Sequence, residues 1–260
     1  MNPVTFVYHG LTDTWAITKR NLYKYIRLPQ LLFFSSIQPV IFLTLFNFVF
    51  GGALGSDVPG GHYINFLLPG ILVQTTLFGA LNTGIGLAED MGKGIIDRFR
   101  SLPMSRAAVM AGRTISDMLR NVVVMTIMLI MGSIYGFRFQ NGFWGAVGMM
   151  VCVLAFSFAF SWVAAFIGMT VKDAETAQLA SFVIIFPLTF ASAAFVPIAT
   201  MPSWLQAFAR NQPVTFAVNA ARELALGLPS TGAVWKLGLW IIGILAVFIP
   251  LSIWRYRQRQ

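Results

Sequence analysis

Six stretches of the chain are apolar enough to enter a lipid bilayer as helices. A spanning helix needs ~20 predominantly apolar residues, because the hydrocarbon core is ~30 Å thick. The sequence therefore predicts six spans, at about 31–50, 64–88, 107–136, 143–170, 176–196 and 234–254. The third has a short uncharged stretch, so we expect its helix to begin near Ala107 with a first section in the membrane interface.

The first 30 residues mix apolar and basic positions. Between Leu11 and Leu28, apolar residues such as Trp15 alternate with Lys19, Arg20 and Lys24, and Pro29 ends the pattern. This pattern predicts an amphipathic helix on the cytoplasmic membrane surface, with its basic side chains facing anionic headgroups. A solvated leader helix is the alternative. We expect no removable signal peptide, since neither its apolar core nor its cleavage site is found here.

The loop after the second span, Gly86 to Arg106, carries acids and bases in mixed order around apolar residues. We expect a short amphipathic helix that docks a partner at the cytoplasmic face; an ordinary charged loop is the alternative. Its glycines lack the spacing of a phosphate loop, so we expect no nucleotide site in this chain. The residues assigned to docking are Glu89, Asp90, Lys93, Asp97, Arg98, Phe99, Arg100, Leu102 and Pro103.

A long, proline-rich segment, Val196–Ala233, separates the fifth and sixth spans. Ser203 to Arg210 places Trp204 and other apolar residues on one face, and Pro213 opens a second helix that ends before Gly227. Both helices are too short to cross the bilayer. We therefore expect interfacial or re-entrant helices that form an outer cap, with an irregular outer loop as the alternative.

Charged residues recur at helical spacing in the third span. Arg113, Asp117 and Arg120 stand at positions i, i+4 and i+7, which places them on one side of the helix. Because one charge at mid-bilayer costs ~2.5–3.5 kcal/mol, we expect this trio at the cytoplasmic interface, pairing internally. It serves either packing or coupling.

Three further helix faces are candidates for packing or for a substrate path. Small, weakly polar faces usually mean close helix packing, but they also line pathways. The first face holds Thr75, Gly79, Asn82 and Gly86; the second holds Ser157, Ser161, Ala164 and Gly168; the third is the stripe Phe182, Phe186 and Phe190. The candidate substrate-path residues are Thr75, Asn82, Phe182, Phe186 and Phe190.

Composition agrees with an all-α integral membrane protein. Hydrophobic residues make up 57% and charged residues 10% of the chain, whereas soluble proteins carry ~25% charged residues. The net charge of +9 is not gathered into one basic patch, so nucleic acid is excluded as a partner. The one cysteine, Cys152, stands in an apolar run and is expected to be buried.

The basic residues favour one side of the predicted spans. With a cytoplasmic N-terminus, only Arg138, Arg210, Arg222 and Lys236 of the 18 Lys and Arg residues lie outside. The remaining fourteen lie inside, which is the positive-inside bias. We therefore expect both termini in the cytoplasm, with a short basic tail at 255–260.

Three stretches carry a family resemblance: EDMGKGIIDRFRSLPMSR after the second span, the following GRTISDML, and VPIATMPSWLQAFARNQPVTFAVNAAREL after the fifth. With the order of elements from about Thr14 to Arg257, they resemble the membrane subunit of type-2 ATP-binding-cassette exporters, especially the bacterial daunorubicin/doxorubicin-resistance permeases. Such a subunit exports drugs, antibiotics or lipid-like metabolites and contributes to multidrug resistance.

The resemblance implies a role for each loop. The segment from Glu89 to Pro103 would be the coupling helix that fits a groove on an ATP-hydrolysing subunit, and the N-terminal helix would be the connecting helix. The segment with Pro197, Pro202, Trp204, Pro213 and Arg222 would be an extracellular re-entrant hairpin. Two such chains, identical or merely similar, would join two ATP-binding subunits in a bacterial plasma membrane. ATP and magnesium would belong to those subunits, and this chain would bind no cofactor.

Other functions remain open at this point. A carrier of lipid-linked polysaccharide or glycolipid has the same architecture. A proton-coupled transporter would place an acid or histidine deep in a span, whereas His9 and His62 lie outside the spans and Asp117 lies near an end. A membrane enzyme would need paired acids, metal-spaced histidines or a nucleophile, so we expect no catalytic and no metal-binding residue.

Overall fold

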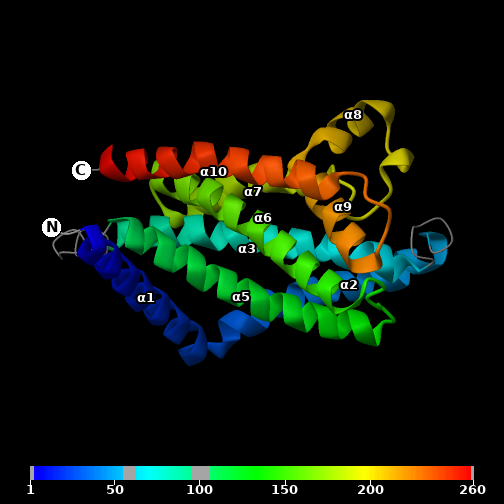
Figure 1. The fold of residues 1–260 in the computed structure, drawn as a ribbon, viewed down its shortest axis with the longest axis horizontal. Coiled ribbons are helices and arrows are strands. Elements are labelled where there is room, and N and C mark those ends of the chain that lie inside the picture. Colours follow the sequence, from blue (N-terminus) through cyan, green and yellow to red (C-terminus); the bar gives the residue numbers. More distant parts are fainter. Residues whose placement is uncertain (1–2, 55–61, 95–105, 259–260) are drawn as a thin grey trace.

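The computed structural model describes residues 3–54, 62–94 and 106–258, which form helices and turns but no strand. The predicted all-α class is therefore confirmed for these residues. The long helices lie roughly side by side along one axis (Figure 1). They are α1 (Pro3–Arg27), α2 (Pro29–Leu54), α3 (Tyr63–Gly92), α5 (Arg106–Ile134), α6 (Gly142–Thr170), α7 (Ala174–Phe190), the 3₁₀ turn η1 (Ile198–Thr200), α8 (Ser203–Asn211), α9 (Pro213–Leu226) and α10 (Ala233–Gln258).

Five of the described helices contain a stretch long and apolar enough to cross a membrane: α2, α3, α5, α6 and α10. The fifth predicted span, 176–196, is a shorter helix than expected, because α7 has 17 residues and ends at Phe190. At 1.5 Å per residue it measures roughly 25 Å, against the ~30 Å hydrocarbon core. The amphipathic helix expected from Leu11 is longer than predicted, since α1 already begins at Pro3.

The central element of the bundle is α3. In α3, 89% of the apolar stretch is buried inside the protein, whereas in α2 only 11% is buried. α3 packs against α2, α5, α6, α7 and α9. Its closest neighbour is α6: a Cβ atom added to Gly84 would lie 2.1 Å from the carbonyl oxygen of Ala164, and one added to Gly168 would lie 2.1 Å from that of Gly84. Only glycine allows these two backbones to touch.

Both chain termini lie at one end of the bundle, and α8 and α9 lie at the other (Figure 1). The hairpin follows its predicted local signals. α9 begins at Pro213, which needs no amide partner in the first turn, and ends before Gly227, whose φ of 62° is the left-handed conformation favoured by glycine. The end that holds α9 is thus remote from the end that holds α1 and the C-terminus of α10.

The start of α7 is set by Asp173. Its carboxylate accepts hydrogen bonds from the Thr176 amide (2.8 Å) and the Thr176 hydroxyl (3.1 Å), which is a standard N-cap arrangement. These two bonds, the amide first, lower the pKa of the Asp173 carboxyl below its usual value, and Lys172 contributes further. The ionised carboxylate therefore holds the first turn of α7.

We expect Asp173→Ala to fray the first turn of α7 at neutral pH. Because the pKa of Asp173 is lowered in the folded chain, its contribution is complete above its ordinary pKa and disappears as the pH falls through the lowered value. Hydrogen exchange at residues 174–176 should therefore be several-fold faster in Asp173→Ala than in the wild type at neutral pH, and the two should converge in acid. Equal exchange at neutral pH would show that the cap does not hold this turn.

Candidate functional site

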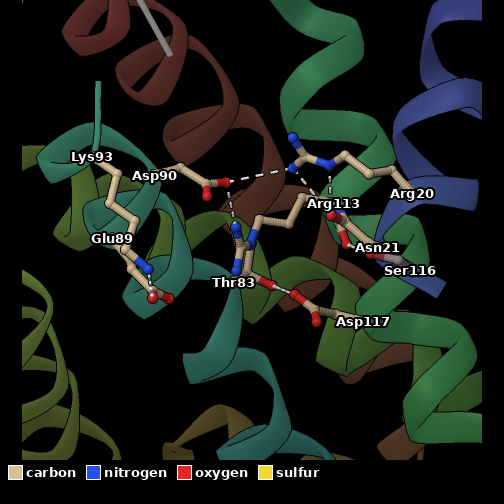
Figure 2. A network of polar contacts seen from close by, with 9 residues as sticks. All are labelled: Arg20, Asn21, Thr83, Glu89, Asp90, Lys93, Arg113, Ser116 and Asp117. Carbon is tan, nitrogen blue, oxygen red and sulfur yellow. Dashed lines mark hydrogen bonds and ion pairs between the residues drawn. The ribbon is translucent and has the colours of Figure 1, made fainter. Parts of the chain in front are cut away.

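One acidic side chain joins three helices at the end of the bundle where the termini lie. Asp90, in the last turn of α3, accepts a hydrogen bond of 2.7 Å from Arg113 of α5 and lies 3.8 Å from the guanidinium of Arg20 of α1. Figure 2 shows Asp90 between these two arginines. The Asp90 and Arg113 side chains are each only 17% exposed, so this ion pair is screened little by water. It fastens α1 and α5 to α3.

Two polar contacts continue this junction along α3 and α5. Beyond Arg113, Asp117 accepts a 2.6 Å hydrogen bond from Thr83 (Figure 2), and Arg120 donates to the Gly79 carbonyl at 2.8 Å. All three members of the predicted trio lie on α5, and each bonds to a residue of α3. Gly79 lies directly against the Arg120 side chain, where a Cβ atom would come within 2.9 Å of Nη2.

A buried polar contact also ties α3, α5 and α6 together. The Asn121 amide donates to the Ser157 hydroxyl (2.9 Å), which in turn donates to the Thr76 carbonyl (2.9 Å). Ser157 and Ser161 are buried, and Gly168 touches α3 directly. The small face of α6 therefore packs against α3 in this structure.

A cavity of about 820 Å³ opens beside this network, between α1, α2, α3, α5 and α7. At one end it is lined by the charged residues described above. Further along, its wall carries uncharged polar groups and aromatic rings: Gln38, Gln74, Thr75, Asn82 and Gln178, with Phe42, Phe78 and Phe182. Such a mixture suits a ligand with both polar groups and an apolar body.

A ladder of phenylalanine rings leads from the cavity toward the end of the bundle that holds α9. Phe182, which lines the cavity, contacts Phe186 (centroids 5.0 Å apart), and Phe186 stacks on Phe190 at 4.3 Å. The contacts continue from Phe190 to Phe195 (5.1 Å) and from Phe195 to Phe46 of α2 (5.0 Å). The three rings of α7 remain 38–44% exposed, so this part of the ladder forms a face that the described residues do not cover.

At the end of the bundle that holds α9, Arg222 of that helix is 5% exposed and joins three segments. Its guanidinium donates to the carbonyls of Phe66 (2.9 Å), Ala193 (2.8 Å) and Ala194 (3.3 Å), and its carbon lies 3.5 Å from the Phe66 ring centroid. It thereby fastens α9 to the start of α3 and to the turn after α7.

Sequence comparison assigns the chain to a protein family. Residues 12–226 match the ABC-2 type transporter family over most of the chain. The chain belongs to this family. Membership implies an ATP-binding-cassette ATPase as partner and assembly with another permease chain. With its several apolar helices, the permease is a multi-pass membrane protein.

Individual relatives are named as transport permeases. The chain is 36% identical over 259 residues to the daunorubicin resistance ABC transporter permease protein of Streptomyces coeruleorubidus, an alignment that covers 98% of this chain and 88% of the relative. It is 28% identical over 223 residues to a probable doxorubicin resistance ABC transporter permease protein of Mycobacterium tuberculosis, covering 84% and 78%. An inner membrane transport permease of Escherichia coli is 23% identical over 227 residues, covering 86% and 87%.

The structure describes only some of the residues predicted to dock the ATPase. Glu89 and Asp90 belong to the last turn of α3, and Lys93 follows that helix and forms an ion pair with Glu89. This pairing raises the pKa of Lys93. The remaining docking residues, Asp97, Arg98, Phe99, Arg100, Leu102 and Pro103, lie outside the described residues. Docking therefore stays a prediction for the permease.

The predicted connecting helix lies along the first half of α5. Thr18 donates to the Gly112 carbonyl at 3.1 Å, and Asn21 donates to the Ser116 hydroxyl at 3.3 Å. Of the residues predicted there, Arg20 turns toward Asp90, whereas Trp15 and Lys19 are exposed. The Lys24 side chain lies outside the described set.

Residue-by-residue reasoning missed several parts of the site. It did not single out Asn21, Gln38, Gln74, Asn121 or Gln178, which line the cavity of the permease. These residues could have been found from the sequence as asparagines and glutamines in or next to apolar runs. A carboxamide in the membrane must find a polar partner, so its position is informative. In the hairpin, Pro197 and Pro202 flank η1 and Trp204 is exposed on α8.

Proposed function

We propose that this permease is the membrane-spanning subunit of an ATP-driven exporter, and that it moves an amphipathic or hydrophobic molecule out of the bacterial cell. The observation that carries the proposal is the cavity of about 820 Å³, whose wall joins carboxamides to phenylalanine rings and continues into the exposed ladder on α7. A drug, an antibiotic or a lipid-like metabolite would meet polar groups first and aromatic rings afterwards. The names of the relatives support drugs as cargo.

The pathway would be completed by a second permease chain, identical or similar. Apolar side chains of α2 and α7, including Leu45 (55% exposed) and Val183 (69% exposed), are not covered by the residues that the structure describes. Packing against a second copy would enclose the two cavities in one passage. With six spans, α7 included, both termini would lie in the cytoplasm, and α8 and α9 would form the re-entrant hairpin at the outer side. The positive-inside bias supports this orientation in the plasma membrane.

A separate ATP-binding subunit would supply the energy, with ATP and magnesium bound there, so the chain would not be an enzyme by itself. Closure of the ATPase pair would push on the segment between α3 and α5. Asp90 stands at the end of α3, next to that segment, and is bonded to both neighbouring helices. Movement would therefore pass into α1, α3 and α5 together and switch access from the inner to the outer side.

ATP-dependent uptake of doxorubicin into inverted vesicles tests this proposal. The vesicles would contain the permease and its ATP-binding subunit. One aromatic contact is worth about 0.5–1.5 kcal/mol, so Phe182→Ala should raise the apparent KM for transport by roughly 2–10-fold. Phe143→Ala is the matched control, because Phe143 is exposed in the first turn of α6 and does not line the cavity.

Two outcomes would contradict the proposal. Transport that stays unchanged in Phe182→Ala, or that falls equally in Phe143→Ala, would remove the cavity from the pathway. Transport of a lipid-linked sugar in place of doxorubicin, with the same dependence on Phe182, would retain the pathway and change the cargo to a glycolipid. Uptake driven by a proton gradient without ATP would show that the energy for transport does not come from ATP hydrolysis.

A further inference from the structure

The helix α1 has two faces with different partners. Its inner face packs against α5: Ile17 and Thr18 are buried, and Thr18 and Asn21 bond to α5. The contact is close, since a Cβ atom added to Gly112 would lie 2.7 Å from the Thr14 carbonyl oxygen. The position of α1 against the bundle is therefore fixed, and so is the direction of its outer face.

The outer face alternates aromatic and basic side chains on successive turns. Trp15, Lys19, Tyr23 and Arg27 recur every four residues and are all exposed, with Trp15 at 62% and Tyr23 at 48%. The Lys19 ammonium lies 5.9 Å from the Tyr23 ring centroid. Of the basic side chains described on α1, Arg20 is held by Asp90, whereas Lys19 and Arg27 point outward. We call these four residues the outer stripe.

The chemistry of the outer stripe matches a membrane surface that bears negative charge. Tryptophan and tyrosine favour the headgroup level, and lysine and arginine next to a spanning helix attract anionic lipids. Only Leu28 separates α1 from α2, which enters the bilayer, so the Arg27 end of the stripe is within reach of headgroups. An acidic protein surface would satisfy the two cations but would give the exposed Trp15 and Tyr23 rings no apolar layer to enter.

We propose that the outer stripe is a binding site for anionic phospholipid headgroups, in which Lys19 and Arg27 bind phosphate and Trp15 and Tyr23 enter the headgroup layer. Because Arg20 on the adjacent side of α1 is tied to Asp90, bound anionic lipid also steadies the junction of α1, α3 and α5. The binding site stands independently; its effect on export rests on the proposed function.

Native mass spectrometry of the full chain, titrated with phosphatidylglycerol or with phosphatidylcholine, tests the site. Each basic residue near an anionic surface strengthens binding roughly fivefold. Lys19→Gln combined with Arg27→Gln should therefore weaken phosphatidylglycerol binding by roughly 25-fold and leave phosphatidylcholine binding unchanged. Lys172→Gln combined with Arg210→Gln removes two exposed positive charges elsewhere and should have little effect.

Three results would overturn the proposal: unchanged phosphatidylglycerol binding in the Lys19/Arg27 variant, an equal loss in the control variant, or equal affinity of the wild type for the two lipids. If the Lys19/Arg27 variant binds lipid normally but no longer associates with the ATP-binding subunit, the outer stripe is a protein-docking face. Lipid binding is measured without transport, so a failure of the proposed export function would leave this result standing.

Discussion

Replacing Arg222 by methionine should destabilise the permease more than any other single change at the end of the bundle that holds α9. The substitution leaves the Phe66, Ala193 and Ala194 carbonyls without the donor that now serves them, and it removes the guanidinium from the Phe66 ring. Leaving a buried carbonyl without its hydrogen-bond donor costs about 1–3 kcal/mol, and three carbonyls are affected here. Because the total stability of a protein is only ~5–15 kcal/mol, we expect a large fall in the folded fraction.

Arg222→Lys should rescue little of this loss. Lysine retains the charge, but its single ammonium does not reach three carbonyls in a fixed fork or stack flat on a ring. Thermal unfolding in detergent measures the effect, and a midpoint lower by roughly 10 °C is expected for both variants, at ~2–4 °C per kcal/mol. Arg210→Met is the matched control, since Arg210 is exposed on α8 and should shift the midpoint by roughly 1–2 °C. A similar midpoint in all three variants would show that Arg222 does not anchor the hairpin.

Helix positions that depend on local signals were predicted closely from the sequence. The span expected at 143–170 is α6 at Gly142–Thr170, and that expected at 107–136 is α5 at Arg106–Ile134. Their lengths follow from the thickness of the bilayer. The start of α9 at Pro213 follows from the geometry of proline. These features need no knowledge of distant contacts.

The end of α7 was not predictable in this way, because it is set by tertiary contacts. Residues 191–196 are as apolar as the helix before them, so composition extended the span to residue 196. In the structure the Ala193 amide donates to the Thr215 hydroxyl, and the Ala193 carbonyl accepts from Arg222. Both partners lie on α9, more than 20 residues later in the chain. The contacts hold the chain in a turn where its composition alone favours helix.

The contacts around Asp90, Arg113 and Arg20 also depend partly on local sequence and partly on helix packing. Spacing predicted Arg113, Asp117 and Arg120 on one side of a helix, and in the structure each of them bonds to α3. The partners of these residues depend on how α5 lies against α3, which spacing does not contain. Asp90 illustrates this, since its assignment to docking came from its loop, whereas its carboxylate is bonded to Arg113 and Arg20. Whether it also contacts the ATPase stays a prediction.

Gly86→Ala should break the Asp90–Arg113 ion pair without changing any charge. A Cβ atom on Gly86 would lie 1.3 Å from Nη2 of Arg113, and the flexible arginine would yield before the helix backbone. Losing an exposed ion pair costs about 0–1 kcal/mol and a buried one about 3–5 kcal/mol; this pair lies between. Alanine favours the helix by ~0.5–1 kcal/mol over glycine, so we expect a net destabilisation of about 1–3 kcal/mol. The ATP consumed per exported molecule should rise several-fold as α5 separates from α3.

Making Gly86→Ala both in the wild type and in the Arg113→Ala variant tests whether displacement of Arg113 causes the loss of stability. In Arg113→Ala there is no guanidinium to displace, so the same substitution should stabilise the permease by ~0.5–1 kcal/mol. Gly92→Ala is a control within the same helix, because a Cβ atom there meets nothing within 4 Å, and it should leave coupling unchanged. The change of sign between the two backgrounds is specific to displacement of Arg113. If Gly86→Ala destabilises equally with and without Arg113, the clash lies in the helix backbones, and the ion pair does not transmit the movement of the ATPase.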